Sequence, residues 1–293
     1  MSAEGVDGSA RERDFDAERQ ATHELWEAAA AGWSRQQAVW GVQSAPVARW
    51  MIDAVALEPG QRLLELAAGT GEVGFLALPL IQPGGTLICS DGSEAMLAVA
   101  RARAAEQGLT GIDFRVLNAE SMDLEVASVD AALCRWGYML MSDPAAALQE
   151  TRRVLRSGGR VSLAVWDAVS ANPWFQIPGA VLAEHGLVSP PPPGAPGPFS
   201  LADPERLRVL LEEAGFDAIA IAAVDIARDA PDFDSWWATQ LDLSVATRTA
   251  FAQADEEQTM AVEAEVAARF APYTAPGGEL SVPGRTLVAV GEA

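Results

Sequence analysis

The sequence predicts an α/β fold, a mostly parallel sheet with helices on both of its faces. Two observations lead to this prediction. From about residue 60 onward, short apolar runs alternate with longer helical stretches, a pattern typical of parallel strands joined by crossover helices. Apolar residues also make up 49% of the 293 residues, which is enough for a large buried core.

Three helical stretches are expected before the sheet, at residues 14–31, 34–42 and 46–57. The third begins at Pro46, and proline is well tolerated in the first turn of a helix. Pro59 and Gly60 would then end it, since neither residue favours a continuing helix.

Seven strands are predicted, and helices separate most of them. The strands are expected at residues 62–67, 86–90, 112–117, 129–134, 160–166, 216–226 and 285–290. The intervening helices are expected at residues 71–81, 93–107, 143–156, 172–185 and 203–214, and a proline-rich loop at 189–198. Ser93 is expected to cap the second of these helices, and Gly158 and Gly159 to stop the third.

The predicted domain organisation is one sheet domain with two additions. Residues 1–45 would form the N-terminal helices and a candidate lid, with residues 1–13 disordered because they are small, polar and charged. Residues 46–230 and 283–293 would form the sheet domain. The intervening residues 231–282 are too long for an ordinary connection and are expected to form a helical cap over the binding cleft.

The charge of the chain limits its chemistry and its partners. The formal net charge is −21, and all twenty basic residues are arginine. Without lysine, Schiff-base and lysine-base catalysis are excluded. Nucleic acid is not expected as a partner, since phosphate binding needs a dense basic surface.

The cysteines and histidines predict no metal centre. Cys89 and Cys134 fall in apolar runs typical of buried thiols, and two histidines are too few for an ordinary zinc site. The N-terminus has no apolar core of a signal peptide, and no apolar run is long enough to cross a bilayer. A cytoplasmic location is therefore predicted.

A glycine-rich turn follows the first predicted strand. Gly69, Gly71 and Gly74 match G-x-G-x-x-G, a nucleotide-binding pattern that alone would also suit NAD. Asp91 lies twenty residues past Gly71, at the end of the next strand, where an acid can bind ribose hydroxyls. Glu65 lies inside the end of the first strand, four residues before Gly69, and its charge would crowd a dinucleotide pyrophosphate but suit a cationic amine.

With its context, this segment resembles motif I of the class I S-adenosylmethionine (SAM) dependent methyltransferases, in the branch of the ubiquinone/menaquinone-type (methyltransferase type 11-like) enzymes. The resemblance covers about residues 45–167 and implies a Rossmann-like sheet and SAM as cofactor. Four further segments match the family in order: Ser90–Leu97, Asn118–Glu120, Cys134–Tyr138 and Leu155–Arg160. Ala67 departs from the family by replacing its first motif I glycine, and Asn118 by replacing a frequent acid.

The resemblance implies a set of cofactor-binding residues. These are Glu65, Ala67, Gly69, Thr70, Gly71, Asp91, Gly92, Met96, Asn118, Ala119, Glu120 and Arg135. Glu65 would hold the ammonium group, Asp91 the ribose, and Met96 would lie against the adenine. Arg135 would bind the SAM carboxylate or a substrate anion, or form an ordinary salt bridge.

Aromatic residues are the candidates for an acceptor pocket, although each could instead serve only packing. The predicted lining is Trp136, Tyr138, Trp174, Phe175, Trp236 and Trp237. His185 and Tyr138 are candidate bases, which methyl transfer needs only if the acceptor must lose a proton. Trp26, Trp33 and Trp40 recur every seven residues and would form either a helical stripe that closes over the cofactor or ordinary core, with core preferred for Trp26.

The predicted function is methyl transfer from SAM to a small, largely apolar acceptor, such as a secondary metabolite, a quinone or a lipid-like molecule. A non-catalytic SAM-binding protein is the alternative. A nicotinamide-dependent oxidoreductase is less favoured, because without lysine the chain cannot have a Tyr-x-x-x-Lys pair. The acceptor, the atom methylated and the oligomeric state are left open.

Overall fold

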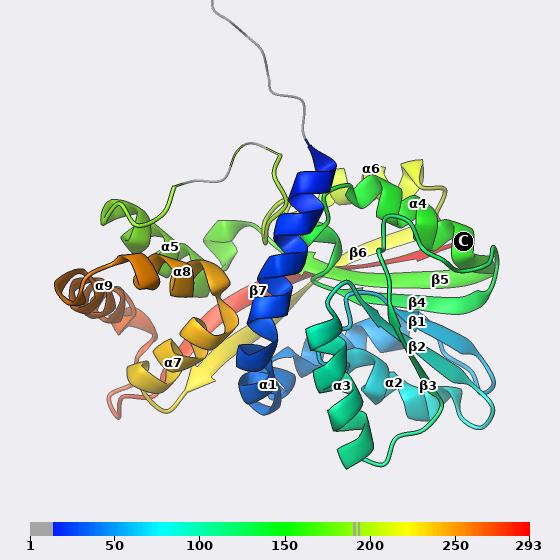
Figure 1. The fold of residues 1–293 in the computed structure, drawn as a ribbon, viewed down its shortest axis with the longest axis horizontal. Coiled ribbons are helices and arrows are strands. Elements are labelled where there is room, and N and C mark those ends of the chain that lie inside the picture. The colour runs from blue at the N-terminus through cyan, green and yellow to red at the C-terminus, as the bar shows by residue number, and fades with distance from the viewer. Residues whose placement is uncertain (1–13, 190–191, 193) are drawn as a thin grey trace, which may run out of the picture.

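The computed structural model describes residues 14–189, 192 and 194–293. The disorder predicted for residues 1–13 and part of the proline-rich loop lie outside these residues. The sheet has the strand order β3-β2-β1-β4-β5-β7-β6. Strand β7 pairs antiparallel with β5 and with β6, and the other neighbouring strands pair parallel. The predicted α/β fold with a seven-stranded, mostly parallel sheet is therefore confirmed (Figure 1).

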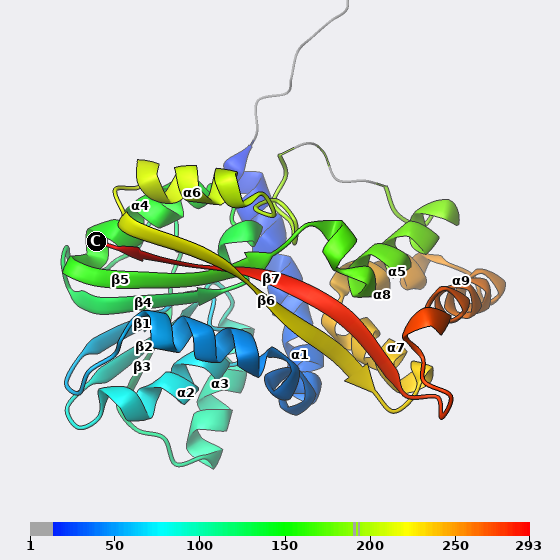
Figure 2. The same cartoon turned by 180° about the vertical axis from the view of Figure 1, so that it is seen from behind.

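The elements follow the predicted alternation. The strands are β1 (Arg62–Glu65), β2 (Thr86–Asp91), β3 (Ile112–Val116), β4 (Val129–Arg135), β5 (Leu155–Trp166), β6 (Asp217–Ala230) and β7 (Leu280–Glu292). The helices are α1 (Phe15–Ala54), α2 (Glu72–Ile81), α3 (Glu94–Glu106), α4 (Pro144–Val154), α5 (Pro173–Glu184), α6 (Pro204–Glu213), α7 (Phe233–Leu243), α8 (Val245–Gln253) and α9 (Glu256–Arg269). Short 3₁₀ turns lie at Tyr138–Leu140, Val169–Ala171 and Ala271–Tyr273. Helices α4 and α6 lie on one side of the sheet, and α2 and α3 on the other (Figures 1 and 2).

The N-terminal region is one continuous helix, so the prediction of three separate helices was wrong. Helix α1 runs for 40 residues and contains Pro46. The predicted break near Gly32 fails because this glycine serves close packing: a Cβ there would lie 2.2 Å from the main-chain oxygen of Asp242 in α7. Since α1 also continues through residue 45, the domain boundary predicted there coincides with no break in the helix.

The predicted boundary between α4 and β5 was also wrong. Helix α4 ends at Val154, and β5 begins at Leu155 rather than at residue 160. Leu155 pairs with Val129 before a shift in register. Gly158, with a φ of +77°, lies inside the strand, where its N–H donates to the main-chain oxygen of Ala293. The two glycines therefore allow an irregular strand instead of stopping the helix.

Strands β6 and β7 form a long antiparallel pair that extends beyond the rest of the sheet toward α7, α8 and α9 (Figure 2). Both strands are longer than predicted, because the pairing runs from Asp217 opposite Glu292 to Ala230 opposite Leu280. Helices α7, α8 and α9 lie between these strands in sequence, as expected for residues 231–282. Helix α1 crosses between this group and helix α3 (Figure 1).

Candidate functional site

The glycine-rich turn follows β1 at the carboxyl end of the parallel strands. Ala67, Gly69 and Gly71 all have positive φ, at 49°, 54° and 79°. Glycine adopts positive φ at little energetic cost, which explains why glycine stands at two of these three positions. A Cβ on Gly69 would meet no atom within 4 Å, whereas one on Gly71 would lie 2.5 Å from the Phe75 ring. Gly71 is thus required for packing, and Gly69 leaves its main chain open to a ligand.

Asp91 is the last residue of β2, and its carboxylate accepts hydrogen bonds from the glycine-rich turn and from the residues that lead into α3. One carboxylate oxygen accepts the N–H of Gly69 at 2.8 Å, and the other accepts the N–H of Ser93 at 2.9 Å. Ser93 in turn caps α3, as predicted, by accepting the N–H of Met96. Burial raises the pKa of Asp91, and the two N–H donors oppose that change. The side chain therefore lies where the sequence places a ribose acceptor.

Glu65 is a buried acid at the end of β1, with only 3% of its surface exposed. Its Oε2 atom has no well-aligned hydrogen-bond partner among the described residues, although the main-chain N–H groups of Val73 and Gly74 face the carboxyl group and act to lower its pKa. A Cβ on Gly74 would lie 2.3 Å from this oxygen, so glycine at 74 lets the carboxyl group lie against the first turn of α2. Burial raises the pKa of Glu65 to about 7. An orphaned buried carboxylate oxygen suits a cationic ligand group.

Arg135 ends β4 and faces the same turn. Its guanidinium forms an ion pair with Glu72 at the start of α2, and its Nη1 donates to Ser44 Oγ of α1 at 2.6 Å. It also lies 4.8 Å from the centre of the Trp136 ring. These partners satisfy Arg135 within the protein, so its contact with a SAM carboxylate stays a prediction.

Glu120 joins three segments around the predicted adenine turn. Its Oε1 accepts the N–H groups of Ser142 and Asp143, at 2.8 and 3.2 Å, while its Oε2 pairs with Arg19 of α1 at 2.7 Å. Its own N–H donates to the Asn118 side chain at 2.9 Å. Both carboxylate oxygens are therefore engaged, and an adenine contact by Asn118, Ala119 or Glu120 stays a prediction.

Helix α1 contacts the matching segment Ser90–Leu97 through side chains that the sequence analysis did not predict. His23 Nδ1 lies 3.0 Å from the main-chain oxygen of Gly92, and Glu27 accepts the N–H of Ala95 at 3.2 Å. With Arg19, these residues recur every four positions and form one polar face of the helix, a spacing that could have revealed them. Met96 is buried beneath α1. The main-chain oxygen of Thr70 accepts a hydrogen bond from Arg103 at 2.6 Å.

A continuous group of aromatic rings extends from the end of β4. Trp136 stacks on Trp166 with 4.5 Å between ring centres, and Trp40 of α1 lies 5.1 Å from Trp136. Trp174 follows at 4.8 Å from Trp166, and Phe175 at 5.7 Å from Trp174. Three of the predicted pocket residues are thus brought together, and sequence reasoning missed Trp166 as their link.

The remaining predicted pocket aromatics lie in α7. Trp236 packs on Phe270 with 4.7 Å between ring centres. Trp237 stacks on Phe233 and donates through its indole N–H to Glu263 of α9 at 3.0 Å. Trp237 therefore packs within the helical group. Trp236 stacks on Trp237, with 6.3 Å between ring centres, and also contacts Arg228, which in turn contacts Trp40 and Trp174.

Neither candidate base lies at the glycine-rich turn. Tyr138 is fully buried, its hydroxyl lies 2.7 Å from Thr151 Oγ1 of α4, and burial raises its pKa well above the ordinary value. His185 follows α5, and its Nε2 lies 3.0 Å from Glu265 of α9. This contact is on the far side of α1 from α2 and α3 (Figure 1). Packing therefore accounts for both side chains.

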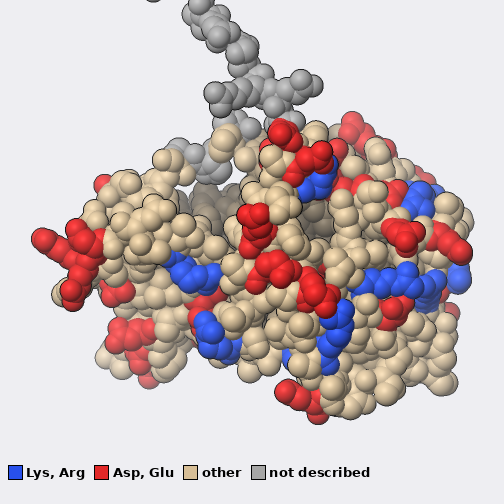
Figure 3. Space-filling view, in the orientation of Figure 1, with Lys and Arg blue, Asp and Glu red and all other residues tan. Residues whose placement is uncertain are grey.

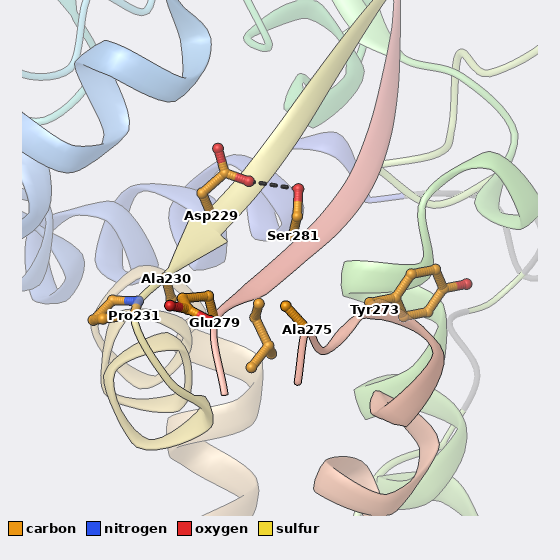
Figure 4. Close-up of a pocket in the computed structure, with 8 residues that line it drawn as sticks. Asp229, Ala230, Pro231, Tyr273, Ala275, Glu279 and Ser281 are labelled. Atoms are coloured by element: carbon orange, nitrogen blue, oxygen red, sulfur yellow. Dashed lines mark hydrogen bonds between the residues drawn. The ribbon is translucent and has the colours of Figure 1, made fainter. Parts of the chain in front are cut away.

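Other surfaces are less suited to the predicted chemistry. Figure 3 shows acidic side chains spread over one face, with separate arginines among them. A surface depression where β6 ends and β7 begins is lined by Asp229, Ala230, Pro231, Tyr273, Ala275, Glu279, Leu280 and Ser281 (Figure 4). Asp229 there accepts from Ser281 at 2.6 Å. This depression is separate from the glycine-rich turn. Within the described residues, no acidic, cysteine or histidine cluster could hold a metal ion, and no helix is long and apolar enough to cross a membrane.

Comparison with known proteins identifies the part of the chain that carries the turn. Residues 64–163 match the family described as "Methyltransferase domain". These residues include the whole segment from Glu65 to Arg135 described above. Residues 64–163 are a methyltransferase domain.

Similar proteins agree with this identification of the methyltransferase domain. The ubiquinone/menaquinone biosynthesis C-methyltransferase UbiE of Xanthomonas oryzae is 33% identical over 129 residues, which are 44% of this chain and 51% of that protein. The chain therefore spans about half the length of this curated relative. Among solved structures, YcgJ from Bacillus subtilis has a TM-score of 0.56 at 20% identity, covering 84% of this chain and 97% of its own. The [4+2]-cyclase SpnF has a TM-score of 0.51 at 20% identity, covering 84% and 80%. The resemblance to class I methyltransferases and the Rossmann-like fold are thus confirmed.

Proposed function

We propose that the protein is a SAM-dependent methyltransferase that acts on a small, largely apolar acceptor. The observation that carries this proposal is the buried carboxyl group of Glu65, whose Oε2 lacks a well-aligned partner and which ends the strand before the glycine-rich turn, within residues that match a methyltransferase domain. A buried carboxylate without a partner fits the ammonium of SAM and disfavours the pyrophosphate of NAD.

Different residues around the turn would bind different parts of the cofactor. Glu65 would bind its ammonium group, directly or through water, and the main chain at Gly69 would allow close approach. Asp91 would accept the ribose hydroxyls, since a carboxylate with two N–H donors retains lone pairs for further hydrogen bonds. Met96 and the turn at Asn118 would contact the adenine.

In methyl transfer from SAM, the main task of the protein is to align the acceptor with the methyl group. SAM carries the methyl group on a sulfonium and supplies the driving force for an in-line displacement. The protein has to hold an acceptor in line with that methyl group and exclude water. Trp136, Trp166 and Trp40 offer an apolar wall next to the end of β4 for this purpose.

The acceptor class is proposed from this wall and from the relatives. A quinone, a secondary metabolite or a lipid-like molecule would suit stacked indoles, and one relative is named for ubiquinone and menaquinone biosynthesis.

We also propose a cytoplasmic protein without a nucleic-acid partner. Its two cysteines are buried free thiols, as expected in a reducing compartment, and its net charge of −21 would repel phosphate.

A non-catalytic SAM-binding protein is the second candidate. A fold similar to that of the chain also occurs in a protein titled a [4+2]-cyclase, so the fold does not by itself require methyl transfer.

The test is release of S-adenosylhomocysteine (SAH) from SAM in the presence of quinols, phenols and apolar carboxylic acids, with Asp91→Ala as the control. The proposal expects acceptor-dependent release that Asp91→Ala strongly reduces at a SAM concentration near the wild-type dissociation constant. SAM binding without release by any acceptor class would favour the second candidate.

A further inference from the structure

Arg228 of β6 is a charged side chain enclosed by tryptophans. Only 2% of its surface is exposed. The guanidinium carbon lies 5.6 Å from the centre of the Trp40 ring, 5.0 Å from that of Trp174 and 5.1 Å from that of Trp236. These rings come from α1, α5 and α7, so three separate helices converge on this one cation.

The guanidinium is only partly satisfied by the protein. Its Nη1 donates to Gln240 Oε1 of α7 at 2.8 Å. Its Nε and Nη2 have no hydrogen-bond partner among the described residues, and neither does the indole nitrogen of Trp40 or of Trp236. Nε and Nη2 share one edge of the planar guanidinium, and that edge presents two parallel N–H groups. The unpaired donors thus match a ligand with two coplanar acceptor oxygens.

No described carboxylate forms an ion pair with Arg228, unlike Arg135 with Glu72 or Arg269 with Glu184. A buried cation without an anion is costly, because aromatic rings replace only part of its lost hydration. Burial lowers the pKa of Arg228 to about 9, so the group stays charged at neutral pH. A charge kept at such a cost is more often found at a binding site than in a packed core.

Arg228 also lies along the aromatic path from the methyltransferase domain. Trp40 contacts both Arg228 and Trp136, and Trp136 directly follows the Arg135 that pairs with Glu72 beside the glycine-rich turn. Trp174 contacts Arg228 and connects through Trp166 to the same Trp136. An acceptor lying along these rings would have one end near the turn and the other at Arg228.

We propose that Arg228, with Trp40, Trp174 and Trp236, binds the carboxylate of the acceptor, whose flat apolar body lies along Trp136 and Trp166. This inference rests on the proposed methyltransferase function and narrows its acceptor to carboxylic acids. Nε and Nη2 of Arg228 would donate to the two carboxylate oxygens, and the indole rings would exclude water from the pair.

Calorimetric titration of a matched pair of probes tests the inference. The probes are 2-naphthoate, a flat carboxylate, and 2-naphthamide, which has nearly the same shape without the charge. Each is titrated into the wild-type protein, with and without saturating SAH, and into Arg228→Gln, Arg228→Lys and Arg285→Gln. Arg285 is the control, because it pairs with Asp225 and is about half exposed, on β7 of the same sheet.

The wild type and Arg285→Gln are expected to bind 2-naphthoate at least tenfold more tightly than 2-naphthamide. Arg228→Gln should lose this preference while binding SAH within twofold of the wild type. Arg228→Lys should keep a reduced preference, since its ammonium has the charge without the two-donor edge. Equal binding of the probes by the wild type, or an undiminished preference in both Arg228 variants, would overturn the inference. Failure of the wild type to bind SAH would instead count against the proposed function.

Discussion

Replacing Glu65 by glutamine probes the feature on which the cofactor assignment depends. Burial raises the pKa of Glu65 to about 7. The carboxyl group would then be about 9% ionised at pH 6 and about 75% ionised at pH 7.5. If its ionised form binds the SAM ammonium, the affinity for SAM should rise about eightfold between these two pH values.

Calorimetry at both pH values measures this rise. Glu65→Gln should bind SAM weakly and almost equally at pH 6 and pH 7.5, because its amide does not titrate. As a control ligand, 5′-methylthioadenosine lacks the amino-acid part and should show neither the rise nor the loss. A SAM affinity that is unchanged in Glu65→Gln, with the same pH dependence as the wild type, would refute the role of Glu65.

The same substitution has a consequence for stability without ligand. Because the folded-state pKa of Glu65 is raised to about 7, above its ordinary value, ionisation favours the unfolded chain. The free energy of unfolding should therefore fall as the pH rises from about 4.5 to about 7, by up to about 3 kcal/mol. Glu65→Gln should be more stable than the wild type at pH 8 in urea unfolding. A less stable variant at pH 8 would contradict the unpaired, buried state of the carboxylate.

Four further substitutions have expected outcomes. Asp91→Ala should lower SAM affinity in calorimetry roughly ten- to hundredfold, the cost of a charged hydrogen-bond acceptor; unchanged affinity would argue against ribose binding. Gly69→Val forces a β-branched residue to a φ of +54° and should abolish SAM binding; a variant that folds and binds SAM normally would contradict a close approach of SAM to the main chain at residue 69. Tyr138→Phe should cost about 1 kcal/mol of unfolding free energy and change turnover less than twofold, whereas a large loss of turnover at unchanged stability would restore Tyr138 as a base. His185→Gln removes a partly buried contact with Glu265 and should leave turnover unchanged; a pH-dependent loss of turnover would show that its imidazole takes part.

The sheet could be predicted from the sequence because each strand is a short apolar run bounded by glycine, proline or polar residues. The ends of elements were less accessible. Gly32 and Gly158 both suggest a helix end, but one allows contact with α7 and the other allows an irregular strand. These are long-range contacts, which a local pattern does not contain. Pro46 likewise lies inside a helix whose length depends on tertiary packing.

Some residues of the candidate site could likewise be predicted from the sequence, and others could not. Glu65, Gly69 and Asp91 could be found because they lie at fixed distances along one strand–turn–helix–strand unit. The roles of Arg135 and Glu120 could not, since their partners Ser44 and Arg19 come from α1, more than ninety residues away in sequence. Arg228 gave no signal either: its neighbours are tryptophans from three distant helices.

The central claim is that the glycine-rich turn binds SAM. Calorimetric titration of the purified protein with SAM, SAH and NADH tests it most directly. Micromolar binding of SAM and SAH, without binding of NADH, is the predicted result. Binding of NADH alone would show that the turn takes a dinucleotide despite the buried carboxylate of Glu65, and would contradict the methyltransferase function.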